Sequence, residues 1–256
     1  REGIEDVAIL YRTNAQSRPL EQELSLAGIP YRIFGGLRFY ERMEIKDILA
    51  ALTLVHNPQN AVCRERIETH LPKYRRKNVI EDLRDMTPTP APIALITRFL
   101  EITEYPDHIR QHYTNADERL ENIAELAAFA ETFPSLDEFL ERVSLLDASD
   151  PPTGGGADAR RAVVNLSTIH LAKGLEFDAV FVAGCAEGVL PHQNALFKSE
   201  DIEEERRLMY VAMTRAKKRL TLSFYDLPSR FLSEIPSHFT VFESASAAHG
   251  AGTKIM

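Results

Sequence analysis

The chain has 256 residues, of which 44% are hydrophobic and 27% charged, so it is long enough for one large domain or two modest ones with a packed core. Its net charge of -8 and isoelectric point of about 5.6 argue against a dedicated nucleic-acid-binding domain, which is usually basic, so any such contact must rest on local residues. No apolar run approaches the length of a membrane span and no signal peptide opens the chain. We therefore expect a cytoplasmic protein without a membrane partner, in which Cys63 and Cys185 are reduced thiols.

Five short apolar runs predict buried strands, and their lack of alternation is typical of a parallel sheet covered on both faces. They are residues 7–11, 31–34, 163–167, 179–183 and 220–224. Helical stretches lie between several of them, at residues 18–26, 45–55 and 202–217. This alternation predicts an α/β layer fold. The first strand follows almost directly on Arg1, which suggests a segment of a longer polypeptide.

The middle of the chain, from about residue 59 to residue 158, shows no convincing strand. Residues 119–132 and 136–146 each carry one apolar stripe at helical spacing. Three prolines at 87–92 predict a turn or linker, and the prolines and glycines of 149–158 predict a flexible joint. We therefore expect a helical domain, residues 59–158, inserted into one α/β domain made of residues 1–58 and 159–256.

The polar loop at 168–178, T-I-H-L-A-K-G-L-E-F-D, lies between two predicted strands. Thr168, His170, Lys173 and Glu176 place a hydroxyl, an imidazole, an ammonium and a carboxylate close together, and Gly174 permits a tight turn or the close approach of a ligand. Ligands bind at strand ends in open α/β sheets, but an ordinary loop has the same composition. The residues alone leave both interpretations equally open.

A second stretch, E-E-E-R-R-L-M-Y-V-A-M-T-R-A-K-K-R at 203–219, has acidic residues at its start and basic residues at its end. This order complements a helix dipole, which is a sufficient structural reason for it. Arg207, Val211 and Arg215 are four apart and share one helix face, from which Arg215 could reach a phosphate across a cleft. A surface salt bridge is the commoner use of such an arginine.

Two shorter stretches follow the first and the last strand. They are Y-R-T-N-A-Q-S-R at 11–18 and S-R-F-L-S-E-I-P at 229–236. In the second, Phe231 could stack on a base while Arg230 pairs with a phosphate. The same ring is equally suited to anchoring the C-terminal segment in the core.

Together these stretches resemble the C-terminal motor domain of superfamily 1 helicases of the UvrD, PcrA and Rep type. Residues 168–178 look like motif V and residues 203–216 like motif VI, and 11–18, 35–47 and 229–236 also match. The resemblance implies an α/β, RecA-like parallel sheet with helices on both faces, interrupted by a compact helical insertion of the 2B type. It also implies an enzyme that hydrolyses ATP to move 3′ to 5′ along single-stranded DNA.

The resemblance further implies roles for single residues. Arg215 would reach the γ-phosphate of ATP and neutralise charge that builds up in the transition state. Glu176 would contact the nucleotide, and Gly174 and Arg12 belong to the segments around the same site. The implied DNA contacts are Asn14, Thr168, His170, His192, Arg230 and Phe231.

Half of the ATP site is missing from this sequence. No G-x-x-x-x-G-K-[ST] motif occurs, and the family's carboxylates for Mg²⁺ belong to the N-terminal RecA-like domain. The resemblance therefore implies a shared site, completed by that domain of the same polypeptide, with no metal ligand supplied by this chain.

The insertion departs from the family pattern. In place of a T-P-x-R-G-I-G stretch associated with duplex contact, it has T-H-L-P-K-Y-R-R-K at 69–77, so binding at junctions of single- and double-stranded DNA does not carry over directly. Lys73, Arg75, Arg76 and Lys77 suit phosphate contact, although a solvated charged face is commoner. Two alternatives to a simple helicase stay open: a helicase–nuclease subunit of the RecB or AddA type, and a non-catalytic module that binds DNA or a partner protein.

Overall fold

The structure is a computed structural model that describes residues 3–71, 79–86, 90–148 and 163–243. The chain divides into two compact units, residues 1–36 with 151–256 and residues 37–150. The sequence placed the first boundary after residue 58 instead. The boundary lies earlier because helix α2 (Met43–His56) supplies much of the core of the second unit. No helix in the described part of the chain is long and apolar enough to cross a membrane.

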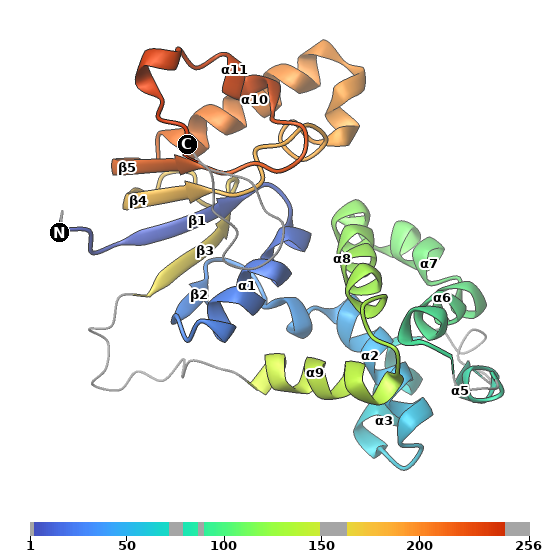
Figure 1. The fold of residues 1–256 in the computed structure, drawn as a ribbon. Coiled ribbons are helices and arrows are strands. Elements are labelled where there is room, and N and C mark those ends of the chain that lie inside the picture. Colours follow the sequence, from blue (N-terminus) through green and yellow to red (C-terminus); the bar gives the residue numbers. More distant parts are fainter. Residues whose placement is uncertain (1–2, 72–78, 87–89, 149–162, 244–256) are drawn as a thin grey trace. The chain divides into compact units, whose positions relative to one another are not determined.

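The first unit is built on a parallel sheet. Its strands are β1 (Val7–Tyr11), β2 (Tyr31–Ile33), β3 (Val164–Thr168), β4 (Phe177–Val182) and β5 (Ala216–Leu222). They lie in the order β2-β3-β1-β4-β5, and each neighbouring pair is parallel, so the arrowheads in Figure 1 all point the same way. All five predicted strands are confirmed. The largest difference is at β5, which begins at Ala216 rather than at residue 220.

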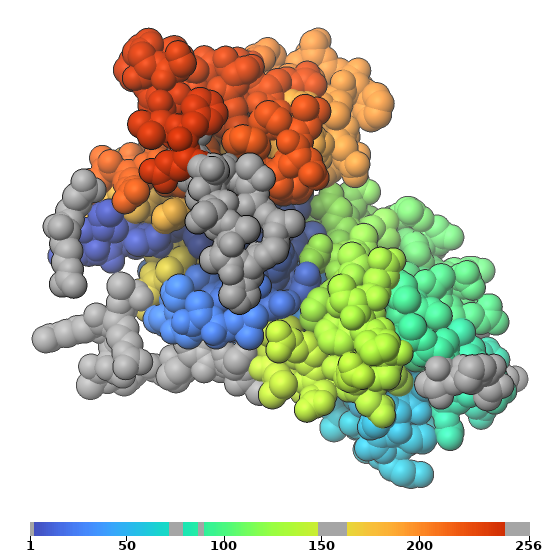
Figure 2. All heavy atoms as spheres, in the orientation of Figure 1, coloured from blue at the N-terminus to red at the C-terminus, as the bar shows by residue number. Residues whose placement is uncertain are grey.

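Helices cover both faces of this sheet. They are α1 (Ser17–Leu26), α10 (Ser199–Met213) and α11 (Arg230–Ser233), with 3-10 turns η1 (Asn14–Gln16), η3 (Gln193–Phe197) and η4 (Ser237–Phe239). Because successive strand residues point to opposite faces, Ala8 and Leu10 pack in the cluster that includes residues of α10 and α11, whereas Tyr11 packs in the cluster that includes residues of α1. This confirms the α/β, RecA-like architecture with two covered faces. In Figure 2 the atoms of the orange-to-red segments, which include α10 and α11, form a continuous packed layer.

The connection between β3 and β4 is unusually short for parallel strands. These strands lie on either side of β1, and only residues 169–176 join the end of one to the start of the other. A crossover of this kind commonly takes a dozen residues or more. Ile169 and Ala172 are fully buried in the same cluster as Ala8 and Leu10. The connection therefore runs from the carboxyl ends of the strands back to their amino ends while it packs against the core of the sheet.

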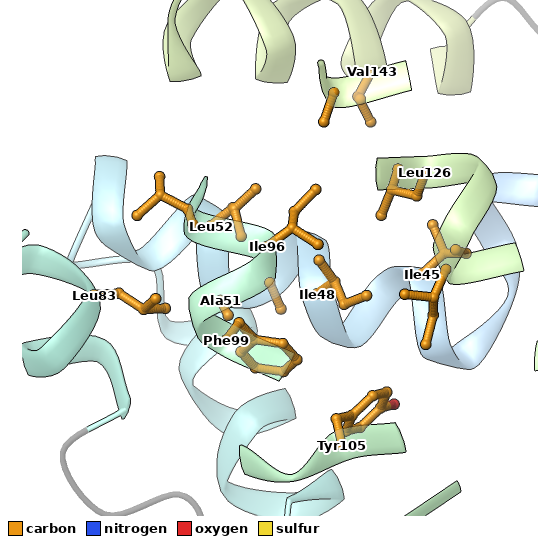
Figure 3. Close-up of a cluster of buried hydrophobic side chains, with 14 of the residues drawn as sticks. Ile45, Ile48, Ala51, Leu52, Leu83, Ile96, Phe99, Tyr105, Leu126 and Val143 are labelled. Atoms are coloured by element: carbon orange, nitrogen blue, oxygen red, sulfur yellow. The ribbon is translucent and has the colours of Figure 1, made fainter. Parts of the chain in front are cut away.

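The described residues of the second unit form helices and turns, which confirms the predicted helical character of the middle. The elements are η2 (Phe39–Glu41), α2 (Met43–His56), α3 (Ala61–His70), α5 (Val79–Arg84), α6 (Pro92–Thr103), α7 (Tyr105–His112), α8 (Ala116–Ala130) and α9 (Leu136–Ala148). Side chains of α2 meet those of α6 and α8 in one apolar core, in which Ile48, Phe99 and Leu126 are fully buried (Figure 3). Pro92 opens α6, a position where its missing N–H costs nothing. The predicted joint at 149–158, the basic run at 73–77 and residues 87–89 of the predicted turn lie outside the described residues.

Candidate functional site

The residues singled out in the sequence gather at two opposite edges of the sheet. In a parallel sheet all carboxyl ends share one edge and all amino ends share the other. Arg12 follows β1 and Thr168 ends β3, so both lie at the carboxyl edge. Glu176 and Arg215 directly precede β4 and β5 and so lie at the amino edge. Glu176 and Arg215 therefore lie at the edge opposite the carboxyl ends where the sequence left a ligand site open, because each directly precedes a strand.

Arg215 is fixed in the turn between α10 and β5. The helix ends at Met213, so Arg215 does not stand on a helix as predicted. Its Nε donates to the carbonyl of Val211 at 3.0 Å, its Nη1 to the carbonyl of Leu175 at 2.9 Å, and its Nη2 to Oγ1 of Thr214 at 3.0 Å. A guanidinium has five N–H donors, so two remain for a ligand after these contacts within the described residues.

Glu176 lies beside Arg215 because the pairing of β4 with β5 begins there. The N–H of Phe177 donates to the carbonyl of Arg215 at 2.9 Å. The Glu176 side chain is exposed, and its carboxylate lies 3.8 Å from Nζ of Lys217. The structure thus brings together a carboxylate from the motif V stretch and an arginine from the motif VI stretch. A carboxylate accepts hydrogen bonds from hydroxyl groups, and an arginine donates them to phosphate oxygens.

The loop ahead of Glu176 is exposed at Lys173 and Gly174. Gly174 has φ +89°, a conformation that other residues adopt only with strain. At the start of the same loop, Thr168 is buried, and its Oγ1 accepts from the N–H of Leu171 at 3.4 Å, whereas the side chain of His170 is exposed. Thr168 therefore shapes the loop, and His170 and Leu171 are exposed to solvent at this end.

Arg12 lies at the carboxyl edge, apart from Glu176 and Arg215, with which the family resemblance grouped it. Its guanidinium binds the carboxylate of Glu205 on α10, with Nε 3.1 Å from each oxygen and Nη2 2.8 Å from Oε1. The other oxygen, Oε2, also accepts the backbone N–H of His192 at 3.0 Å. Arg12 and His192 are thus held by one buried carboxylate at the carboxyl edge.

Gln16 fixes the segment that carries Asn14. Its Oε1 accepts the backbone N–H groups of Arg12 at 2.9 Å and Thr13 at 3.0 Å, and its Nε2 donates to the carbonyl of Ala183 at 3.3 Å. Gly184 lies so close that an added Cβ would stand 2.5 Å from Nε2 of Gln16. The turn after β1 is therefore bound tightly to the turn after β4.

Phe231 and Arg230, two predicted DNA contacts, each have partners within the unit. The ring of Phe231 is only 3% exposed and packs in the core, with the guanidinium of Arg206 centred 5.4 Å from it. It therefore has no open face for a base, and the anchor interpretation describes it. Arg230 forms a two-pronged pair with Glu187, with Nε 3.0 Å from Oε1 and Nη2 2.8 Å from Oε2. The hydrogen bonds from Arg230 lower the pKa of Glu187.

Sequence reasoning missed Glu205 and Gln16. Three successive glutamates near a helix start are ordinary, and nothing in the sequence separates the buried Glu205 from its exposed neighbours Glu203 and Glu204. Among the described residues, no group of three or more His, Cys, Asp or Glu side chains could hold a metal ion.

Comparison with known proteins supplies the family. The model of the UvrD-like helicase C-terminal domain matches residues 1–115 and 93–226. The chain is 35% identical to the ATP-dependent DNA helicase PcrA of Bacillus subtilis, over 91% of this chain and 40% of that protein. It is also 35% identical to the ATP-dependent DNA helicase UvrD1 of Mycobacterium tuberculosis (strain H37Rv), over 90% of this chain and 39% of that protein. With DNA helicase II of Escherichia coli it shares 32% identity, over 91% of this chain and 41% of that protein.

The chain thus spans about 40% of the length of the curated relatives that it matches. The matches run through both the sheet unit and the helical unit, and they include the stretches that carry Glu176, Glu205 and Arg215. This chain belongs to the family of UvrD-like helicase C-terminal domains.

Proposed function

We propose that the sheet unit is the second motor domain of a 3′-to-5′ ATP-dependent DNA helicase. It would complete an ATP site with an N-terminal RecA-like domain of the same polypeptide. The observation that carries the proposal is that Glu176 and Arg215 lie next to each other at the amino edge of the sheet, where the residue after Glu176 bonds to the carbonyl of Arg215 and Arg215 keeps two donor hydrogens after its contacts within the described residues. The names of the relatives, which are ATP-dependent DNA helicases, support the same activity.

The chemistry of the two side chains suits a nucleotide shared between domains. The guanidinium of Arg215 would donate to the γ-phosphate and neutralise the charge that grows on it during phosphoryl transfer. The carboxylate of Glu176 would accept a hydrogen bond from a ribose hydroxyl. By the family resemblance the ligands of Mg²⁺ would lie mainly on the other domain, so these two residues would bind and orient the nucleotide while that domain holds the metal.

The carboxyl edge would be the surface for single-stranded DNA. Asn14, His170 and His192 all lie in the turns at this edge and are at least partly exposed. Residues 169–176 run from this edge to Glu176, so one packed segment would respond to both DNA and nucleotide. Such an element could couple the two sites if it has two arrangements that the ligands favour differently. Contact with a duplex junction would fall to the helical unit.

Steady-state kinetics of the full-length protein test this proposal. Wild-type protein should hydrolyse ATP faster when single-stranded DNA is present. Arg215→Ala should lower kcat by about a thousandfold, as for other arginines that act in trans on a phosphoryl group. Arg215→Lys should be nearly as damaging, because an ammonium lacks the planar fork.

Arg207→Ala is the matched control. Arg207 lies on α10, two turns before Arg215, and its side chain is 74% exposed beside Glu204, so its removal should leave kcat unchanged. A near-normal kcat for Arg215→Ala, or equal losses for both variants, would show that Arg215 does not act at the nucleotide.

A further inference from the structure

Glu205 is a buried carboxylate at which three separate segments meet. It stands on α10, and it is 6% exposed. Arg12, from the turn after β1, gives it three contacts of 2.8 to 3.1 Å, and the N–H of His192, from the turn after β4, gives it a fourth at 3.0 Å. Both carboxylate oxygens are thus engaged, by a side chain of one turn and by the backbone of the other.

These contacts control the placement of side chains that the proposed function puts at DNA. Arg12 stands two positions before Asn14, and His192 is itself one of the proposed contacts. A charged hydrogen bond in a buried setting holds its partners more firmly than one in water. The carboxylate also neutralises Arg12, so Arg12 is engaged inside the unit and Asn14 and His192 are left to face the ligand.

The same helix carries this arrangement towards the nucleotide. Glu205 is eight residues before Met213, the last residue of α10, which corresponds to roughly 12 Å along the helix. Since α10 ends at Met213 and Nε of Arg215 bonds back to the carbonyl of Val211, the arginine moves with the end of the helix. A displacement of the DNA-side turns would therefore act on α10 through Glu205 and reach Arg215 at the other edge.

We infer that Glu205 is the positioning residue that fixes the DNA-binding turns to α10. This inference rests on the proposed function for the assignment of the two edges. It assigns to Glu205 no contact with DNA or ATP. Its effect is on the placement of Asn14 and His192, so its loss should weaken the response to DNA and spare the affinity for ATP.

The test compares full-length wild type, Glu205→Gln and the control Glu204→Gln. Glu204 is the preceding residue, and its side chain is 73% exposed. The amide of a glutamine at 205 keeps the size of the side chain but loses the charge and turns one acceptor into a donor. Two measurements are made for each protein: direct binding of single-stranded oligothymidylate by fluorescence anisotropy, and ATP hydrolysis as a function of its concentration.

For Glu205→Gln, the dissociation constant for oligothymidylate and the concentration for half-maximal stimulation should each rise about tenfold. The KM for ATP should stay within about twofold of wild type. A general loss of folded protein would not weaken DNA binding while leaving the KM for ATP unchanged. Glu204→Gln should behave as wild type. If Glu205→Gln does not fold, Glu205→Asp replaces it. The shorter aspartate keeps the charge but cannot reach Arg12 and His192 together. We expect a smaller loss of DNA affinity, again with an unchanged KM for ATP.

Unchanged DNA binding in the folded Glu205 variant, or an equal loss in Glu204→Gln, would overturn the inference. Because binding is measured directly, the outcome does not depend on catalysis. Wild type that binds DNA without stimulated hydrolysis would refute the proposed function, while the comparison of the variants would still decide the role of Glu205.

Discussion

The guanidinium of Arg215 illustrates how a single side chain would be prepared for the nucleotide of the proposed shared site. Three hydrogen bonds to Val211, Leu175 and Thr214 fix its orientation before any nucleotide arrives. Ordering a long side chain opposes binding, and here much of that ordering has already taken place on folding. Lysine could not reproduce this, since its three donors spread from one nitrogen rather than from a planar fork.

Phe231 shows the opposite case, in which a suggestive residue serves the core. Because its ring is 3% exposed, Phe231→Ala should lower the free energy of unfolding by about 3–5 kcal/mol, the usual range for a buried aromatic. Urea unfolding of the purified chain measures this. Phe239→Ala is the control, since that ring is 76% exposed and should cost little. A Phe231→Ala variant of unchanged stability that had lost affinity for single-stranded DNA would restore the stacking interpretation.

The strands of the sheet were predictable because a buried strand has a continuous run of apolar residues, which is visible in the local sequence. Continuous runs of Val, Ile, Leu and Phe indicated five strands, and all five are present. The order β2-β3-β1-β4-β5 was not predictable, because pairing depends on contacts between residues far apart in the chain. That order decides which motif residues share an edge, so Glu176 and Arg215 were identified as a pair while their edge, and the separate position of Arg12, were not.

Helix ends and helix partners were less predictable than helix cores. α3 and α7 are short and carry only one and two buried residues, so their apolar periodicity is faint. The end of α10 was placed too late, since the basic residues after Met213 suit a helix terminus as well as they suit an exposed strand. The core that α2 shares with later helices likewise depends on long-range packing, so the first domain boundary fell after α2 rather than before it.

Helix α2 also carries a buried charge that holds the second unit together. Asp47 is 1% exposed, with Oδ2 accepting the hydroxyl of Tyr105 at 2.6 Å and Oδ1 2.7 Å from Nε of Arg66. Burial and the adjacent Asp47 raise the pKa of Tyr105, so the hydroxyl stays protonated and remains a donor. This pair ties α7 to α2 through a contact that no apolar stripe would reveal.

The contribution of this pair can be measured by removing one oxygen. Tyr105→Phe leaves Oδ2 of Asp47 buried without its donor, and it should lower the free energy of unfolding by about 1–3 kcal/mol. Tyr210→Phe is the control, because the Tyr210 side chain is 69% exposed on α10. This substitution should change the free energy of unfolding by only a small fraction of the effect of Tyr105→Phe. Equal unfolding curves for the two variants would mean that the hydroxyl of Tyr105 adds nothing to stability.

At the scale of the whole molecule, the sheet unit separates the two proposed ligand surfaces by the length of its strands. The amino edge holds Glu176 and Arg215, and the carboxyl edge holds Asn14 and His192. Residues 169–176 and helix α10 both run between these edges within one packed core. A motor needs such elements, because binding at one site can influence the other only through parts whose position both ligands affect.

The proposal that this chain supplies only half of an ATP site leads to a prediction for the 256-residue chain alone. It has the arginine that is proposed to act in the transition state but no phosphate-binding loop in its sequence, so the electrostatic and positioning contributions of that loop and of Mg²⁺ would be missing. The purified chain should therefore show no ATP hydrolysis that single-stranded DNA stimulates, and it should bind ATP weakly. Phosphate release and nucleotide binding are measured side by side with the full-length protein, which serves as the positive control. Arg215→Ala in the isolated chain identifies contaminating activity, since a signal that survives this change does not come from the proposed site. If the isolated chain shows DNA-stimulated ATP hydrolysis, and Arg215→Ala abolishes it, then these residues form a complete ATP site. The proposal of a site shared with another domain would then be wrong.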